Sequence, residues 1–145
     1  MLGNFCSLQG DPESAIELFQ RAVQIDPSFT YAYTLSGHEY FANEEYDKSM
    51  ACFRTAVRID PRHYNAMYGL GQIFYRQEKL EMAMVHFKSA SLINPSSSVL
   101  HCYIAMTLHR QGMHERALAK LKVGRSSYAN GMGSVWMSKN FLSIP

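Results

Sequence analysis

The chain has 145 residues, of which 47% are hydrophobic, and a formal net charge of +2 at pH 7. This apolar fraction is sufficient for a folded core. Lysine and arginine are scattered rather than clustered, which argues against nucleic-acid binding, and no apolar run reaches the length of a membrane span.

The first predicted helix pair joins residues 1–9 to residues 12–25. Apolar residues recur at three- and four-residue steps in the second helix, which predicts one buried stripe. The residues of this stripe are Ala15, Leu18, Phe19, Ala22 and Ile25. Asp11 is the expected N-cap, because Pro12 suits the first helical position. Pro27 is expected to stop the helix, since proline lacks an amide hydrogen and clashes with the preceding turn.

Three further helix pairs follow from the same reasoning. The predicted pairs are residues 30–42 with 46–59, 64–76 with 80–93, and 98–110 with 114–122. Small residues are expected where paired helices cross, because only small side chains allow the axes to approach within about 8–10 Å. Gly37 should therefore meet Ser49, and Gly71 should meet Ala83.

The prolines that close these units, Pro27, Pro61 and Pro95, lie 34 residues apart, and other columns repeat in step with them. One column holds small residues and another holds large apolar ones. Their members are Ala15, Ser49, Ala83 and Ala117, and Phe19, Phe53, Phe87 and Leu121. A period of this length is typical of the tetratricopeptide repeat, a helix-turn-helix unit that stacks into a solenoid. We therefore expect an all-α solenoid of about three and a half repeats.

The pattern divides the chain into a repeat array, residues 1–121, and a tail, residues 122–145. The expected units lie near 1–27, 28–61, 62–95 and 96–121. In the tail the columns fail, Ala129 takes the place of proline, and the stretch RSSYANGMGS is loop-like. We expect the tail to be mobile or to dock weakly through Trp136 and Phe141. Because neither end supplies a polar cap, the chain is interpreted as a segment of a longer solenoid.

The sequence contains no recognisable catalytic or metal-binding pattern. None of the six histidines has a second histidine or a carboxylate at a metal-ligand spacing, and no serine or cysteine lies in a nucleophile motif. His101 replaces an aromatic residue near the start of a repeat and is expected to be packed. Cys6, Cys52 and Cys102 fit neither a disulfide framework nor a zinc site, so we expect buried free thiols. The prediction is that the chain is not an enzyme and needs no metal or cofactor.

The first helix of each pair carries aromatic and polar residues that lie off the core stripe. Such residues would line the inner groove of a solenoid, where rigid aromatics and amides can grip an extended peptide. The expected groove residues are Asn4, Tyr31, Thr34, His38, Phe41, Tyr68, Gln72, Tyr75, Arg76, His109 and Arg110. Arg76 and Arg110 recur one repeat apart and could receive a terminal carboxylate. The alternative, that these side chains are solvated or fill contacts between repeats, stays open.

Several stretches are more specific than the generic repeat: YAYTLSGHEYF, ACFRTAVRIDPRHYNAMYGLGQIFYRQEKL and INPSSSVL. They resemble the C-terminal repeats of the third subunit of the anaphase-promoting complex, or cyclosome, a tetratricopeptide scaffold of a ubiquitin ligase. The resemblance covers residues 3 to about 121. It implies mitotic regulation and a superhelix that receives the Ile-Arg tail of coactivators. For such a tail, Glu39 is the first candidate to accept the cationic side chain, and Asn4 to bond its backbone.

The resemblance implies a non-catalytic protein-interaction scaffold of the nucleus and cytoplasm. Its partners would be coactivator tails or other subunits of the complex, with neither nucleic acid nor membrane. Homodimerisation belongs to the N-terminal half of that family and is not carried over. Two alternatives stay open, a purely structural repeat segment and a co-chaperone or assembly adaptor. The second is disfavoured because the places of a lysine-asparagine carboxylate clamp hold Thr34, His38, Tyr68 and Gln72.

Overall fold

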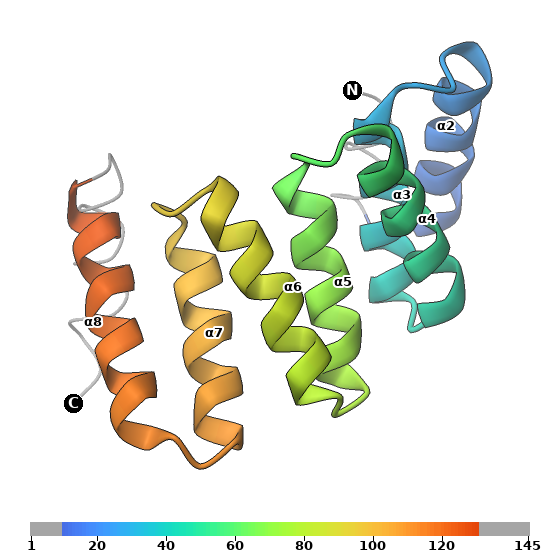
Figure 1. The fold of residues 1–145 in the computed structure, drawn as a ribbon. Coiled ribbons are helices and arrows are strands. Elements are labelled where there is room, and N and C mark those ends of the chain that lie inside the picture. Colours follow the sequence, from blue (N-terminus) through green and yellow to red (C-terminus); the bar gives the residue numbers. More distant parts are fainter. Residues whose placement is uncertain (1–9, 131–145) are drawn as a thin grey trace.

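A computed structural model describes residues 10–130, with side chains through Ser126, and shows a stack of antiparallel helices (Figure 1). The helices are α2 (Pro12–Ile25), α3 (Thr30–Ala42), α4 (Tyr46–Ile59), α5 (Tyr64–Arg76), α6 (Leu80–Ile93), α7 (Ser98–Arg110) and α8 (His114–Asn130). Between residues 10 and 130 there is no strand. The predicted all-α solenoid is confirmed.

The helix bounds follow the sequence signals closely. The six helices α2 to α7 begin and end at the predicted residues. Asp11 caps α2 as expected, with a side-chain oxygen that accepts a hydrogen bond from the Ser14 amide at 3.2 Å. Helices α2, α4 and α6 each stop just before the proline column.

The predicted end of the last helix at residue 122 is wrong, because α8 continues to Asn130. Ala129 stands in the proline column, and alanine both keeps its amide hydrogen and favours helix. The first part of the stretch expected to be loop-like is therefore helical. The predicted helix over residues 1–9 and the contacts predicted for Trp136 and Phe141 lie outside the described residues. The division into array and tail stays a prediction.

The core is built where a second helix meets two first helices. Phe53 of α4 is fully buried, and a Cβ added at Gly37 of α3 or Gly69 of α5 would lie 2.7 and 2.3 Å from its ring atoms. Glycine is therefore needed at both positions to admit the ring. The Ser49 hydroxyl donates to the Gly37 carbonyl oxygen at 2.6 Å, which confirms the predicted meeting of these two residues.

Two residues expected to be buried are exposed. Ile25 is the last residue of α2, next to the turn, and 87% of its surface is exposed. Cys102 on α7 is exposed, whereas Cys52 is half-buried. Cys102 stands in the same repeat column as Thr34 and Tyr68. The helices of those two residues, α3 and α5, are each followed by the first helix of another unit. Within residues 10–130 no such helix follows α7, so Cys102 is left uncovered. Burial raises the pKa of the Cys52 thiol.

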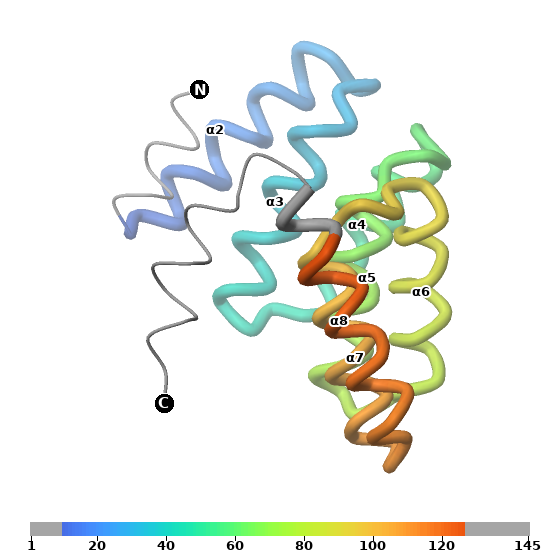
Figure 2. The backbone as a smooth tube through the Cα atoms, turned by 90° about the vertical axis from the view of Figure 1, so that its left-hand side faces the viewer, coloured from blue at the N-terminus to red at the C-terminus, as the bar shows by residue number. Residues whose placement is uncertain are grey.

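The direction of the helices changes along the stack, so that α2 and α3 are inclined to α7 and α8 (Figure 2). The first helices α3 and α5 also contact one another across the repeat boundary. Equivalent positions on successive first helices therefore lie on the same side of the stack. No helix in the described part of the chain is long and apolar enough to cross a membrane.

Candidate functional site

A groove of about 400 Å³ lies between the first helices α3, α5 and α7. It is lined by Phe41, Gln72, Tyr75, Arg76, Tyr103, Met106 and Arg110, and we call it the arginine groove. Its walls come from three successive units, because the 34-residue period brings the same face of each first helix to one side. A ligand in this groove would contact several repeats at once.

Both guanidinium groups of the arginine groove rest on aromatic rings. The Arg76 Cζ lies 5.9 Å from the centre of the Phe41 ring, and the Arg110 Cζ lies 4.9 Å from the centre of the Tyr75 ring. Contact with a ring face stabilises a cation and limits its motion. The Arg110 guanidinium also donates to a Glu78 carboxylate oxygen at 2.7 Å. The groove thus presents two oriented positive charges, one of which already binds a carboxylate.

A polar network fixes the amide of Gln72. Its Nε2 donates to the hydroxyl oxygens of Tyr68 at 2.8 Å and Tyr103 at 2.9 Å. Burial, followed by the neighbouring Tyr103 hydroxyl, raises the pKa of Tyr68 well above its ordinary value, so the phenol stays neutral. No described residue donates to the Gln72 carbonyl oxygen. That oxygen can therefore accept from a peptide N–H.

A second groove, of about 520 Å³, lies where α7 meets α8. We call it the α7–α8 groove, and it is lined by Tyr75, Ala105, Met106, His109, Arg110, His114, Ala117, Leu118 and Leu121. Because Tyr75, Met106 and Arg110 line both grooves, the two adjoin. At its rim the Nδ1 atoms of His109 and His114 lie 3.0 Å apart. Within residues 10–130 no three His, Cys, Asp or Glu side chains gather as metal ligands would.

The structure brings many of the predicted groove residues together. Those in the arginine groove are Phe41, Gln72, Tyr75, Arg76 and Arg110. Tyr68 holds the Gln72 amide beside it, and His109 lines the α7–α8 groove.

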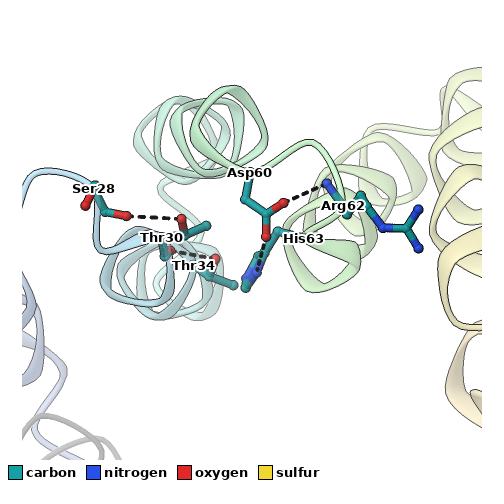
Figure 3. A network of polar contacts seen from close by, with 6 residues as sticks. All are labelled: Ser28, Thr30, Thr34, Asp60, Arg62 and His63. Carbon is teal, nitrogen blue, oxygen red and sulfur yellow. Dashed lines mark hydrogen bonds and ion pairs between the residues drawn. The ribbon is translucent and has the colours of Figure 1, made fainter.

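Other predicted groove residues lie elsewhere. Only 3% of Thr34 is exposed, and its hydroxyl donates to the Thr30 carbonyl oxygen at 3.1 Å (Figure 3). We therefore remove Thr34 from the candidate site, since β-branched threonine can turn its hydroxyl back onto its own helix. Tyr31 is 49% exposed, but it packs edge-on against His63 at 5.9 Å and lines neither groove.

His38 and Glu39 also lie outside the arginine groove. His38 is half-buried, with its ring 4.9 Å from that of Phe53. Burial, followed by the nearby His63, lowers the pKa of His38, so its ring is neutral at neutral pH. Glu39 is half-buried and lines neither groove. Asn4 lies outside the described residues.

Comparison with known proteins agrees with the period and the fold. Residues 37–78 match the family described as TPR repeat, and residues 1–29 match the family described as tetratricopeptide repeat. The chain belongs to the tetratricopeptide-repeat family.

Within this family the chain resembles subunit 3 of the anaphase-promoting complex. It is 59% identical over 121 residues to "Cell division cycle protein 27 homolog A" of Arabidopsis thaliana, a match covering 83% of this chain and 17% of the relative. It is 55% identical over 49 residues to "Anaphase-promoting complex subunit 3" of Schizosaccharomyces pombe, covering 34% of this chain and 7% of the relative. The chain thus matches only a small part of the length of these relatives.

Solved structures support the tetratricopeptide fold alone. The crystal structure of MamA superimposes with a TM-score of 0.79 at 20% sequence identity, covering 89% of this chain and 75% of that chain. Identity at this level shows a shared architecture and says nothing about partners.

Two residues of the arginine groove, Tyr103 and Met106, were not predicted from the sequence. Met106 occupies the same repeat column as His38 and Gln72, so the period itself could have identified it. Tyr103 shares its column with Leu35 and Gly69, which give no sign of a groove position. Only the hydrogen bond from Gln72 Nε2 to the Tyr103 hydroxyl shows that this residue lies in the groove.

Proposed function

We propose that this tetratricopeptide array is a non-catalytic scaffold segment of the anaphase-promoting complex whose arginine groove receives the C-terminal tail of a coactivator. The observation that carries the proposal is the pair of guanidinium groups, Arg76 and Arg110, held on aromatic rings in one groove. The resemblance to subunit 3 of that complex supports the choice of partner. The proposed setting is ubiquitination in the cell cycle, in the nucleus and cytoplasm.

The groove can bind a peptide with a free C-terminal carboxylate and an apolar side chain at the residue before the last. A carboxylate can form paired, charge-assisted hydrogen bonds with a guanidinium group. The rings of Tyr75 and Tyr103 and the side chain of Met106 offer apolar walls for the isoleucine of an Ile-Arg tail. The Glu78 carboxylate, which accepts a hydrogen bond from Arg110, could instead bind the cationic side chain of the tail. Glu39 lies outside this groove, so Glu78 replaces it as the first candidate for that side chain, and Asn4 stays an untested candidate for the backbone.

A peptide titration tests this proposal. A fluorescent peptide that ends in Ile-Arg is titrated against the parent chain and against Arg76→Gln, Arg110→Gln, Glu39→Gln and Asn4→Ala. Arg58→Gln is the matched control, because Arg58 is an exposed arginine on the second helix α4. Loss of one hydrogen bond to a charged group should weaken binding roughly ten- to a hundredfold. A peptide with an amidated terminus should lose a similar factor, while Arg58→Gln should bind like the parent.

The outcomes distinguish the alternatives. If Arg76→Gln and Arg110→Gln bind like the Arg58→Gln control, the arginine groove is not the receptor. If the folded parent chain binds no Ile-Arg peptide, a structural role in contact with neighbouring subunits is favoured. If an acidic chaperone tail binds more tightly than the Ile-Arg peptide, the adaptor alternative is favoured. Circular dichroism of each variant shows that folding is retained.

A further inference from the structure

The last second helix exposes a surface that the other second helices bury. Leu121 stands in the column of Phe53 and Phe87, both of which are 0% exposed, yet 43% of Leu121 is exposed. Leu118 stands in the column of Met50, which is half-buried, and Met84, which is 6% exposed, yet 59% of Leu118 is exposed. Both leucines line the α7–α8 groove.

The difference has a structural cause. Phe53 and Phe87 are covered by the first helix of the following unit: the backbone of Gly69 on α5 meets the ring of Phe53, and the Tyr103 ring on α7 lies 5.2 Å from that of Phe87. Within residues 10–130, no helix follows α8. The α7–α8 groove therefore corresponds to the surface on which the next first helix packs in the earlier units. Within residues 10–130 this surface is left uncovered.

We propose that residues 131–145 of this chain dock in the α7–α8 groove, with Trp136 and Phe141 against Leu118 and Leu121. Adding the 34-residue period to α7 places the next covering segment at 132–144, within these residues. That interval is rich in apolar side chains, namely Met132, Val135, Trp136, Met137, Phe141, Leu142 and Ile144. Burial of two aromatic side chains against two half-exposed leucines supplies the driving force.

Residues 131–145 are covalently joined to α8, which favours them over a second copy of the chain as the segment that binds in the groove. Leu118 lies about 18 Å back along α8 from Asn130. Residues 131–145 can span about 50 Å when extended, so they reach the groove with ease. A tethered segment also acts at an effective concentration on the order of millimolar, far above that of free chains in dilute solution. The proposal does not depend on what the arginine groove binds.

Trp136 is the single tryptophan of the chain, so selectively excited tryptophan fluorescence reports on the surroundings of this residue, and the variants below assign them to the groove. Emission and acrylamide quenching are measured on the parent chain, on the double variant Leu118→Asp with Leu121→Asp, and on Phe141→Ser. Leu92→Asp is the control, because Leu92 is 86% exposed on α6. The parent and the control should show blue-shifted emission and a quenching constant several-fold below that of the urea-unfolded chain. The double variant and Phe141→Ser should approach the unfolded value.

Three results would overturn the proposal. The first is a parent Trp136 quenched as in the unfolded chain. The second is protection that survives both the double variant and Phe141→Ser, which lies outside the described array and therefore tests the contact even if the double variant unfolds. The third is protection that disappears on dilution, which would assign the groove to a second copy. Circular dichroism separates loss of contact from loss of fold.

Discussion

At the scale of single residues, Phe53 links three helices and two repeats. Its ring belongs to α4 and meets the backbone of Gly37 on α3 and of Gly69 on α5. Its burial therefore contributes both to its own hairpin and to the stacking of the next one. In a short solenoid each unit depends on its neighbours for a covered core, so such a residue acts on the whole array.

Truncation of this side chain should destabilise the protein strongly. We predict that Phe53→Ala lowers the free energy of unfolding by about 3–5 kcal/mol, through lost burial and the cavity that remains. The control is Leu92→Ala, since 86% of Leu92 is exposed and its truncation should change little. Thermal melts followed by circular dichroism measure both. A melt of Phe53→Ala that overlays the parent would contradict the packing described for this ring.

Acidification should destabilise the array through its packed histidines. Burial lowers the pKa values of His38, His63 and His86 in the folded chain. The unfolded chain then binds more protons, so stability is complete above the unfolded histidine pKa of about 6.5 and falls as the pH drops below it. Melting temperatures across this range should decline less steeply for His38→Asn than for the parent. The exposed-site variant His114→Gln serves as the control, and equal slopes for all three would refute the role of His38.

At the scale of elements, the turns between paired helices repeat as faithfully as the core columns. Gly10, Glu44, Glu78 and Gly112 all have positive φ angles, between 61° and 81°, and they lie 34 residues apart. Glycine adopts this backbone readily, whereas a residue with a Cβ is strained by about 1–2 kcal/mol. The two glutamates therefore hold a conformation better suited to glycine.

Glycine should relieve that strain. Glu44→Gly is expected to raise the free energy of unfolding by about 0.5–1 kcal/mol, the strain removed minus the entropy cost of glycine. Asn43→Gly is the adjacent control; its φ is −83°, so glycine there should only destabilise. Urea titration compares the two variants. Destabilisation by both would show that the Glu44 backbone is not strained.

The glycines on first helices serve packing instead. Gly69→Ala should gain about 1 kcal/mol of helix propensity. However, its Cβ would lie 2.3 Å from a carbon of the Phe53 ring, so overpacking should prevail and cost about 1–3 kcal/mol net. Combining it with Phe53→Leu should recover part of the loss, because the smaller side chain makes room. If the two changes simply add in a double-mutant cycle, the close contact is not the cause.

The elements also show what the sequence can predict. The bounds of α2 to α7 were predictable because proline and apolar periodicity act locally. The end of α8 does not follow from the local pattern, because the glycine and serine of this stretch favour a loop although no proline stops the helix. The left-handed turns at Glu44 and Glu78 have no local signal, since glutamate rarely adopts positive φ, and only the repeat column that they share with Gly10 and Gly112 indicates them. The place of Tyr103 depends on a contact between repeats, and that of Thr34 on a bond within its own helix, neither of which the period alone specifies.

At the scale of the whole molecule, the stack turns isolated side chains into a continuous surface. The arginine groove is lined by three units and adjoins the α7–α8 groove. No single hairpin contains both Arg76 and Arg110, so binding that needs both charges requires stacked repeats. A ligand in the groove should therefore also stabilise the array against unfolding.

The proposed function requires that a peptide tail binds in the arginine groove, between first helices. The most direct test is photo-crosslinking of a peptide that carries a benzophenone next to its C-terminal arginine, followed by mass spectrometry of the adducts. If the tail binds there, adducts are expected on α5 and α7, at or beside Tyr75, Tyr103 and Met106, and they should be lost when unlabelled peptide competes. Adducts confined to the second helices α4 and α6, or the absence of any competable adduct on the folded chain, would contradict it.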